Sequence, residues 1–147
     1  FSLRRYMKVS IVVSPKGQES KALMDVGRAL ATTLEKRGYS SELLNTSIDT
    51  DKKLILSDYL IVVAEPLSFF SSKLSPKLSK YLENAGTISG KRGSTILLGN
   101  TLFKTKAMSS LMTIVEGQGV ILKTSQFVKN PSQAVSFANT INVERNY

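Results

Sequence analysis

The sequence of 147 residues contains no cysteine and no histidine. Without cysteine, the chain cannot form disulfides, thiolate nucleophiles or cysteine-ligated metal sites, and this absence agrees with a cytoplasmic location. Without histidine, it lacks the usual general base at neutral pH and the most common metal ligand. Its eleven acidic residues are scattered and show no metal-loop spacing. An enzyme of this composition would therefore need a bound cofactor for its chemistry.

Long apolar runs are also missing. The longest run, Leu60 to Ala64, is far shorter than the roughly 20 residues that cross a bilayer. No apolar segment follows the arginines near the start, so nothing resembles a secretory signal, and we expect no membrane partner. We expect residues 1–6 to be a leader or an added end. Residues 7–144 should form one domain, because no linker, repeat or low-complexity segment divides them.

Acidic residues are too few to balance the basic ones, which leaves a net charge of +9. Such a charge favours a negatively charged partner, which can be a phosphate-bearing ligand, an acidic protein or nucleic acid. The basic residues are spread along the chain, so an ordinary solvated surface explains the charge equally well. No recognisable motif supports nucleic-acid binding, which we therefore do not expect.

Apolar runs alternate with helical patterns about five times along the chain. Continuous apolar runs predict three buried strands at Met7–Val13, Tyr59–Ala64 and Ser94–Gly99. Shorter or less regular runs predict two more, Ser40–Leu44 and Gly119–Phe127. Strands that are apolar throughout are typical of a parallel sheet covered on both faces. We therefore predict an α/β fold, a three-layer sandwich around one five-stranded parallel sheet.

The segments between these strands show helical spacing and start signals. Apolar residues recur at helical spacing in Glu19–Arg37 and Thr105–Glu116. Ser75 with Pro76, and Asn130 with Pro131, each place a capping residue before a proline, as at helix starts. The first of these two helices should run to about Asn84. We also expect a helical turn or short helix at Asp49–Leu56.

Three loops should lie at the edge of the sheet where ligands bind. In an open parallel sheet this edge is formed by the carboxyl ends of the strands, near the point where the strand order reverses. The candidates are Ser14–Ser20, Glu65–Leu74 and Gly99–Lys104. The prediction depends only on the expected sheet.

The first of these loops contains groups that suit a phosphate. Backbone N–H groups at a helix start attract anions, Gly17 would allow a tight turn, and Lys16 adds positive charge. Ser14 and Ser20 can donate hydrogen bonds. An ordinary strand-to-helix turn capped by serine explains the loop equally well, and Glu19 opposes phosphate unless its side chain points away.

Other nucleotide motifs fail on inspection. No G-x-G-x-x-G follows the first strand. The segment from Gly86 to Arg92 is too short for a nucleotide-binding P-loop and has arginine where serine or threonine is needed. A phosphoryl-accepting receiver domain would need aspartates where Ser14 and Glu65 stand.

The second loop and the helix after it resemble flavodoxin-like flavoproteins. "AEPLSFFSSKLSPKLSKYLEN", residues 64–84, is similar to a segment of these proteins that begins with a small polar residue and proline. Matching positions include Pro66, Phe69, Ser75, Pro76 and Lys80. "SPKGQES", residues 14–20, is similar to the S-P-R-x-x-x-S phosphate loop of NAD(P)H-dependent FMN reductases. The resemblance covers about residues 7–141 and implies strand order 2-1-3-4-5.

The resemblance implies a site for FMN built from all three loops. The first loop would surround the phosphate, the second would line one side of the isoalloxazine ring and the third would flank the other. By position these residues are Ser14, Lys16, Gly17, Gln18 and Ser20; Pro66, Leu67, Ser68 and Phe69; and Gly99, Asn100, Thr101 and Phe103. Phe69, Phe70 and Phe103 are the candidates for stacking on the ring.

Such a site implies a redox function. The chain would be an FMN-binding electron-transfer protein or an NAD(P)H-dependent flavin or quinone reductase, with NAD(P)H or a redox protein as partner. Reductases of this type often pair through their helices, so a homodimer is one of the alternatives for this chain.

Some residues depart from the pattern of these flavoproteins and motivate a second hypothesis. Glu65 replaces the small polar residue before the proline, and Phe70 replaces a glycine, so Phe70 would redirect the loop or fill the flavin pocket. The third loop lacks the glycine-rich or aromatic stretch that normally meets the ring. The alternative is a flavodoxin-like domain that has lost flavin and serves as a binding or regulatory module.

Overall fold

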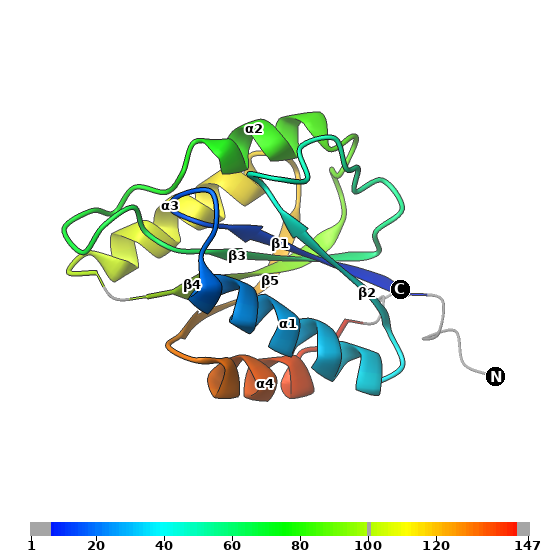
Figure 1. The fold of residues 1–147 in the computed structure, drawn as a ribbon. Coiled ribbons are helices and arrows are strands. Elements are labelled where there is room, and N and C mark those ends of the chain that lie inside the picture. The colour runs from blue at the N-terminus through cyan, green and yellow to red at the C-terminus, as the bar shows by residue number, and fades with distance from the viewer. Residues whose placement is uncertain (1–6, 100, 144–147) are drawn as a thin grey trace.

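The computed structural model describes residues 7–99 and 101–143, which form a five-stranded parallel sheet with four helices (Figure 1). The strands are β1 (Lys8–Ser14), β2 (Ser40–Asn45), β3 (Tyr59–Ala64), β4 (Arg92–Leu98) and β5 (Ile121–Val128), in the order β2-β1-β3-β4-β5. The helices are α1 (Lys21–Lys36), α2 (Lys77–Asn84), α3 (Lys104–Glu116) and α4 (Pro131–Thr140). The predicted architecture and strand order are confirmed.

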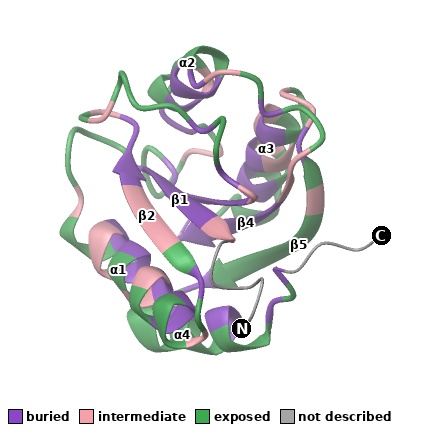
Figure 2. Cartoon of the chain, turned by 90° about the vertical axis from the view of Figure 1, so that its right-hand side faces the viewer, coloured by how far each residue is buried: buried purple, intermediate pink, exposed green. Residues whose placement is uncertain are grey.

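The helices cover the sheet on both faces and make the three predicted layers. In Figure 1, α1 and α4 lie below the sheet, and α2 and α3 lie above it. Alternate side chains of the central strands enter the two cores: Val13 and Ile61 pack towards α1 and α4, whereas Val12 and Leu60 pack towards α2 and α3. Figure 2 shows the central strands as a buried layer between the helices. In the part of the chain that is described, no helix is long and apolar enough to span a membrane.

Strand register aligns the loops that follow β1, β3 and β4. Ser14 at the end of β1 pairs with Ala64 at the end of β3, and Ala64 pairs with Leu97 near the end of β4. Gly93 on β4 lies so close to β3 that an added Cβ would stand 2.6 Å from the carbonyl oxygen of Leu60. The first, second and third loops therefore leave the sheet side by side.

Helix starts follow the predicted capping residues to within one or two positions. The Asn130 side chain accepts a hydrogen bond from the Gln133 N–H (2.9 Å), and Pro131 is the first residue of α4. Ser20 caps α1 by accepting from the Leu23 N–H (3.3 Å). The Ser75 hydroxyl accepts from the Lys77 N–H (3.3 Å), although α2 begins one residue after Pro76. Polar capping at these positions ties up N–H groups that a helix leaves without partners.

Of the two alternatives expected at Asp49–Leu56, a helical turn or a short helix, no helix forms, and the structure has successive turns there. The backbone of this segment bonds elsewhere: the Leu54 N–H donates to the Ala85 carbonyl (2.9 Å). The Asp49 carboxylate accepts from the Asn45 N–H (2.8 Å), which holds the chain in a turn directly after β2. Since these partners lie outside the segment, its own apolar spacing could not reveal them.

Candidate functional site

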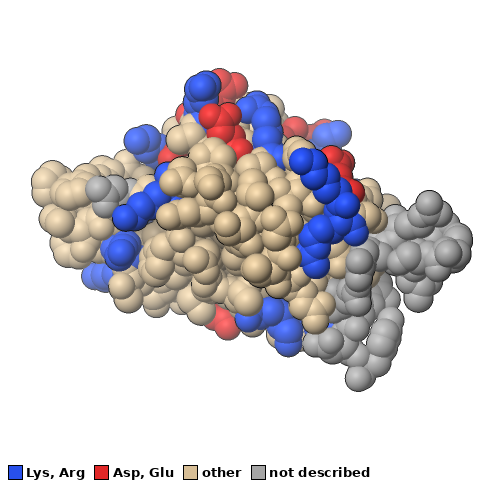
Figure 3. Space-filling view, turned by 90° about the horizontal axis from the view of Figure 1, so that it is seen from below, with Lys and Arg blue, Asp and Glu red and all other residues tan. Residues whose placement is uncertain are grey.

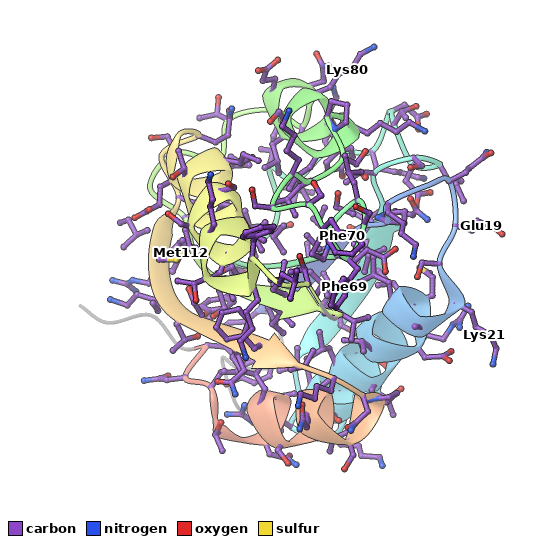
Figure 4. All side chains as sticks on the ribbon, turned by 90° about the vertical axis from the view of Figure 1, so that its left-hand side faces the viewer. Glu19, Lys21, Phe69, Phe70, Lys80 and Met112 are labelled. Carbon is purple, nitrogen blue, oxygen red and sulfur yellow. The ribbon has the colours of Figure 1, made fainter. Side chains whose placement is uncertain are left out.

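The three predicted loops lie together at the carboxyl edge of the sheet. The first loop (residues 15–20) joins β1 to α1, the second loop (65–76) joins β3 to α2, and the third loop (99–103) joins β4 to α3. They meet at the left of Figure 1, and Figure 4 looks directly onto them. The three loops therefore converge at the edge of the sheet where the sequence predicted a site.

The first loop is held by two side chains at and just after the end of β2, which the sequence argument missed. The Asn45 side-chain amide donates to the Gln18 carbonyl (3.3 Å), and the Ser47 hydroxyl donates to the Gly17 carbonyl (3.2 Å). Both residues stand at the same carboxyl edge, so the rule that located the three loops could also have found them.

Glycine is not required at Gly17. Its φ is not in the left-handed region, and an added Cβ would meet nothing within 4 Å. The turn in the first loop therefore does not depend on glycine at this position. Glu19 is exposed, and Figure 4 shows its side chain pointing away from the loop into solvent.

The donors that would hold a phosphate are already bound to a carboxylate of the chain itself. The Lys16 N–H donates to Glu65 Oε1 (3.0 Å), and the Ser20 hydroxyl donates to Glu65 Oε2 (3.2 Å). Glu65 is the first residue after β3 and is only 8% exposed. Its carboxylate therefore lies where the resemblance places the FMN phosphate.

This arrangement does not fit an FMN phosphate. A phosphate bound by Lys16 and Ser20 would contact the Glu65 carboxylate directly. Two like unit charges at contact distance repel by about 4 kcal/mol even at an effective dielectric constant of 20. The same donors cannot serve both anions, so the Glu65 side chain and the phosphate exclude one another.

Two hydroxyl groups near the carboxyl ends of β1 and β2 are buried without a hydrogen-bond partner among the described residues. Ser14 ends β1 and is 1% exposed, and Thr46 follows β2 and is 2% exposed. Of the residues predicted to contact phosphate, Ser14 is thus present but unused, whereas Lys16 and Ser20 are engaged by Glu65. Buried polar groups without partners are uncommon in folded proteins.

The second and third loops touch at their bases. Pro66 is buried, and Gly99 has a φ of +108°, a conformation that favours glycine. A Cβ added at Gly99 would lie 3.8 Å from the Pro66 Cδ. Two predicted ring-site residues, Pro66 and Gly99, are therefore neighbours. Asn100, also predicted for this site, lies outside the described residues.

Hydrogen bonds clamp the same two loops together further out. Thr101 Oγ1 lies 2.8 Å from the carbonyl oxygens of both Phe69 and Ser71, so its single hydroxyl proton is shared between these two acceptors. The Leu102 N–H donates to the Phe69 carbonyl (3.0 Å). A flat ring between two walls needs contact distance on both faces, which is about 7 Å in total. At Phe69 and Leu102, the two predicted walls of the ring site are joined directly and leave no such gap.

The clamped loops expose a cluster of large apolar side chains, which we call the apolar tip. Phe70 is 75% exposed, so of the two alternatives for this residue, redirecting the loop or filling a flavin pocket, it does not fill a pocket. Its ring meets the Phe69 ring edge-to-face, with centroids 5.1 Å apart, and Figure 4 shows both at the centre of the carboxyl edge. The members of the apolar tip are Leu67, Phe69, Phe70, Leu102 and Phe103.

Lysines begin the three helices that follow the three loops. The first residues of α1, α2 and α3 are Lys21, Lys77 and Lys104, and no acidic residue lies in their first turns. A positive charge at the positive end of a helix dipole is locally unfavourable by about 0.3–1 kcal/mol. Lys16 and Lys73 add charge from the loops. Figure 3 shows lysine or arginine atoms beside the uncharged left-hand end of the molecule.

Within residues 7–99 and 101–143, no group of acidic side chains is placed to hold a metal ion. The titratable groups that are clearly perturbed are two core tyrosines. Burial raises the pKa of Tyr59, and burial together with Glu42, Asp49 and Asp51 raises the pKa of Tyr81 to about 12. Both therefore stay protonated at neutral pH, and neither lies in the three loops.

Comparison with known proteins identifies the fold. No family model and no curated protein matches the sequence. Solved structures do match, among them oxidised flavodoxin 1 from Bacillus cereus (TM-score 0.68, 12% identity, 90% of this chain and 95% of that chain). A cysteine-to-serine mutant of flavodoxin from Pseudomonas aeruginosa gives a TM-score of 0.70 at 16% identity, over 90% of this chain and 95% of that chain.

A larger oxidoreductase also contains this fold. The rubredoxin oxygen:oxidoreductase from Desulfovibrio gigas aligns with 91% of this chain, with a TM-score of 0.70 and 17% identity, but only 35% of its own length is covered. This chain thus spans about a third of that protein. The chain has a flavodoxin-like fold, as the resemblance of its loops implied, and at these identities the likeness concerns the fold alone.

Proposed function

We propose that this chain is a flavodoxin-like binding module that does not carry flavin, and that its apolar tip binds an acidic protein segment with apolar side chains. The apolar tip carries the proposal. Five large apolar side chains stay exposed on two clamped loops, at the edge where this fold usually holds its ligand. Large apolar side chains exposed together on adjoining loops are typical of interaction sites.

Charge at the same edge selects an acidic partner. Lys16, Lys73 and Lys104 lie on the three loops or begin the next helix, and Glu65 is buried, which leaves Glu19 as the exposed acid of these loops. A partner with acidic groups around apolar anchors complements this surface. No recognisable nucleic-acid motif accompanies these side chains in the sequence, which favours a protein segment over nucleic acid as the partner.

The partner class can be tested with labelled synthetic peptides and fluorescence anisotropy. We expect a peptide of glutamate, leucine and phenylalanine to bind at least tenfold more tightly than one in which serine replaces the apolar residues. The double variant Phe69→Ser/Phe70→Ser should lose at least tenfold in affinity, because it removes exposed anchors without touching the core. Added salt should weaken binding by screening the lysines.

A matched control removes an apolar side chain elsewhere. Leu56 is 81% exposed and lies between β2 and β3, outside the three loops, so Leu56→Ser should leave peptide binding unchanged. Equal losses in Leu56→Ser and in the tip variant would contradict the proposal. So would tighter binding of short single-stranded DNA than of the acidic–apolar peptide.

An FMN-binding redox protein is the second candidate function. It would transfer electrons or reduce flavins or quinones with NAD(P)H. The buried, unpartnered hydroxyl of Ser14 and the fold favour it, because Ser14 is at the position that the resemblance assigns to the phosphate. For this function the Glu65 side chain must leave the first loop, and the second and third loops must separate at Thr101.

A further inference from the structure

We infer that the Glu65 carboxylate is the resident anion of the first loop and that it excludes phosphate from a site otherwise built to hold one. Its two oxygens are each held by a loop donor, Oε1 by the Lys16 N–H and Oε2 by the Ser20 hydroxyl. A backbone N–H before a helix and the capping hydroxyl are the kinds of donor that bind phosphates in other proteins. The loop therefore holds an oxyanion, and that oxyanion belongs to the chain.

The origin of Glu65 separates this arrangement from ordinary helix capping. A capping-box carboxylate comes from the helix itself, three residues after the cap. Glu65 instead follows directly after the neighbouring strand β3, 45 residues from Ser20 and 49 from Lys16 in sequence. The pairing of Ser14 with Ala64 brings it beside the loop.

Hydrogen bonds alone hold this carboxylate. Among residues 7–99 and 101–143, no lysine or arginine forms an ion pair with Glu65, and the Lys16 side chain is exposed. A buried carboxylate bound only by N–H and O–H donors is in the environment that such a loop offers to a phosphate. The chemical class that Glu65 displaces is therefore a phosphate monoester or inorganic phosphate.

Partner binding at the apolar tip does not require this contact, because the tip lies on the second and third loops. Replacing Glu65 by a small polar residue should free both donors and remove the repelling charge. The first loop should then bind phosphate, while peptide binding at the apolar tip stays as in the wild type. Failure of one proposal therefore leaves the other standing.

The test compares wild type with Glu65→Ser by following the backbone amide signals of Lys16 and Ser20 in NMR during titration with inorganic phosphate. We expect saturable shifts in Glu65→Ser, with an affinity at least tenfold above that of wild type. FMN should shift the same amides, whereas riboflavin, which lacks the phosphate, should not.

Glu19→Ser is the matched control, because it removes an exposed acid from the same loop without freeing the donors. It should behave like wild type. If Glu65→Ser does not fold, Glu65→Gln keeps the shape without the charge and should also bind phosphate more tightly than wild type. A folded Glu65 variant that shows no phosphate-dependent shifts, or a Glu19→Ser variant that gains binding equally, would overturn the inference.

Discussion

Glu65→Ala is expected to lower the free energy of unfolding by about 2–3 kcal/mol, because hydrogen bonds to a charged group contribute about 1.5–3 kcal/mol each and some desolvation cost is relieved. The Lys16 N–H and the Ser20 hydroxyl both lose their acceptor. Urea or thermal unfolding monitored by circular dichroism measures the change. A shift of about 5–10 °C in Tm corresponds to this loss for a chain of this size.

Added phosphate shows whether Glu65→Ala is destabilised because the first loop has lost its bound anion or only because two hydrogen bonds are gone. Phosphate should raise the Tm of Glu65→Ala more than that of wild type, since a ligand that binds only the folded state stabilises it. Glu19→Ala serves as the control and should change stability by less than about 0.5 kcal/mol, because its side chain is exposed. Wild-type stability in Glu65→Ala would show that the carboxylate does not support the first loop.

Gly93→Ala is expected to destabilise the chain by about 3 kcal/mol, because the new Cβ would press on backbone rather than on a movable side chain. The Cβ would stand 2.6 Å from the carbonyl oxygen of Leu60. Gly93 belongs to β4 and Leu60 to β3, so the substitution forces apart the strands that position the second and third loops. Equilibrium unfolding in urea measures the loss.

Gly17→Ala is the matched control for this substitution. Nothing lies within 4 Å of an added Cβ there, and its φ is outside the left-handed region. Alanine should therefore leave stability unchanged or raise it by about 0.4–1 kcal/mol through the unfolded state. Equal destabilisation by both substitutions would contradict the close approach of β3 and β4.

Much of the fold could be predicted because its signals are local. Tyr59–Ala64 is apolar throughout, which only a strand buried on both faces explains, and Asn130 with Pro131 marks a helix start within two residues. The segment after β2 could not be predicted this way. Its backbone bonds to Ala85, a distant partner that no local pattern reveals.

The position of the candidate site could also be predicted, but its contents could not. Parallel strands put their carboxyl ends at one edge, so the three loops had to meet. The resemblance marked Glu65 as a charged residue where these flavoproteins have a small polar one. Its contacts with Lys16 and Ser20 depend on atoms brought together from 45 or more residues away. Similarly, the exposure of Phe70 follows from the Thr101 clamp, a contact between loops.

Titration of the wild-type protein with FMN tests the central claim most directly. Glu65 occupies the phosphate donors, and the clamp at Thr101 joins the walls of the ring site. We therefore predict that high micromolar FMN keeps its full fluorescence and an unshifted visible spectrum in the presence of the protein. Quenched fluorescence and a shifted spectrum at micromolar FMN, or a protein that is yellow as purified, would contradict the account and favour the redox function.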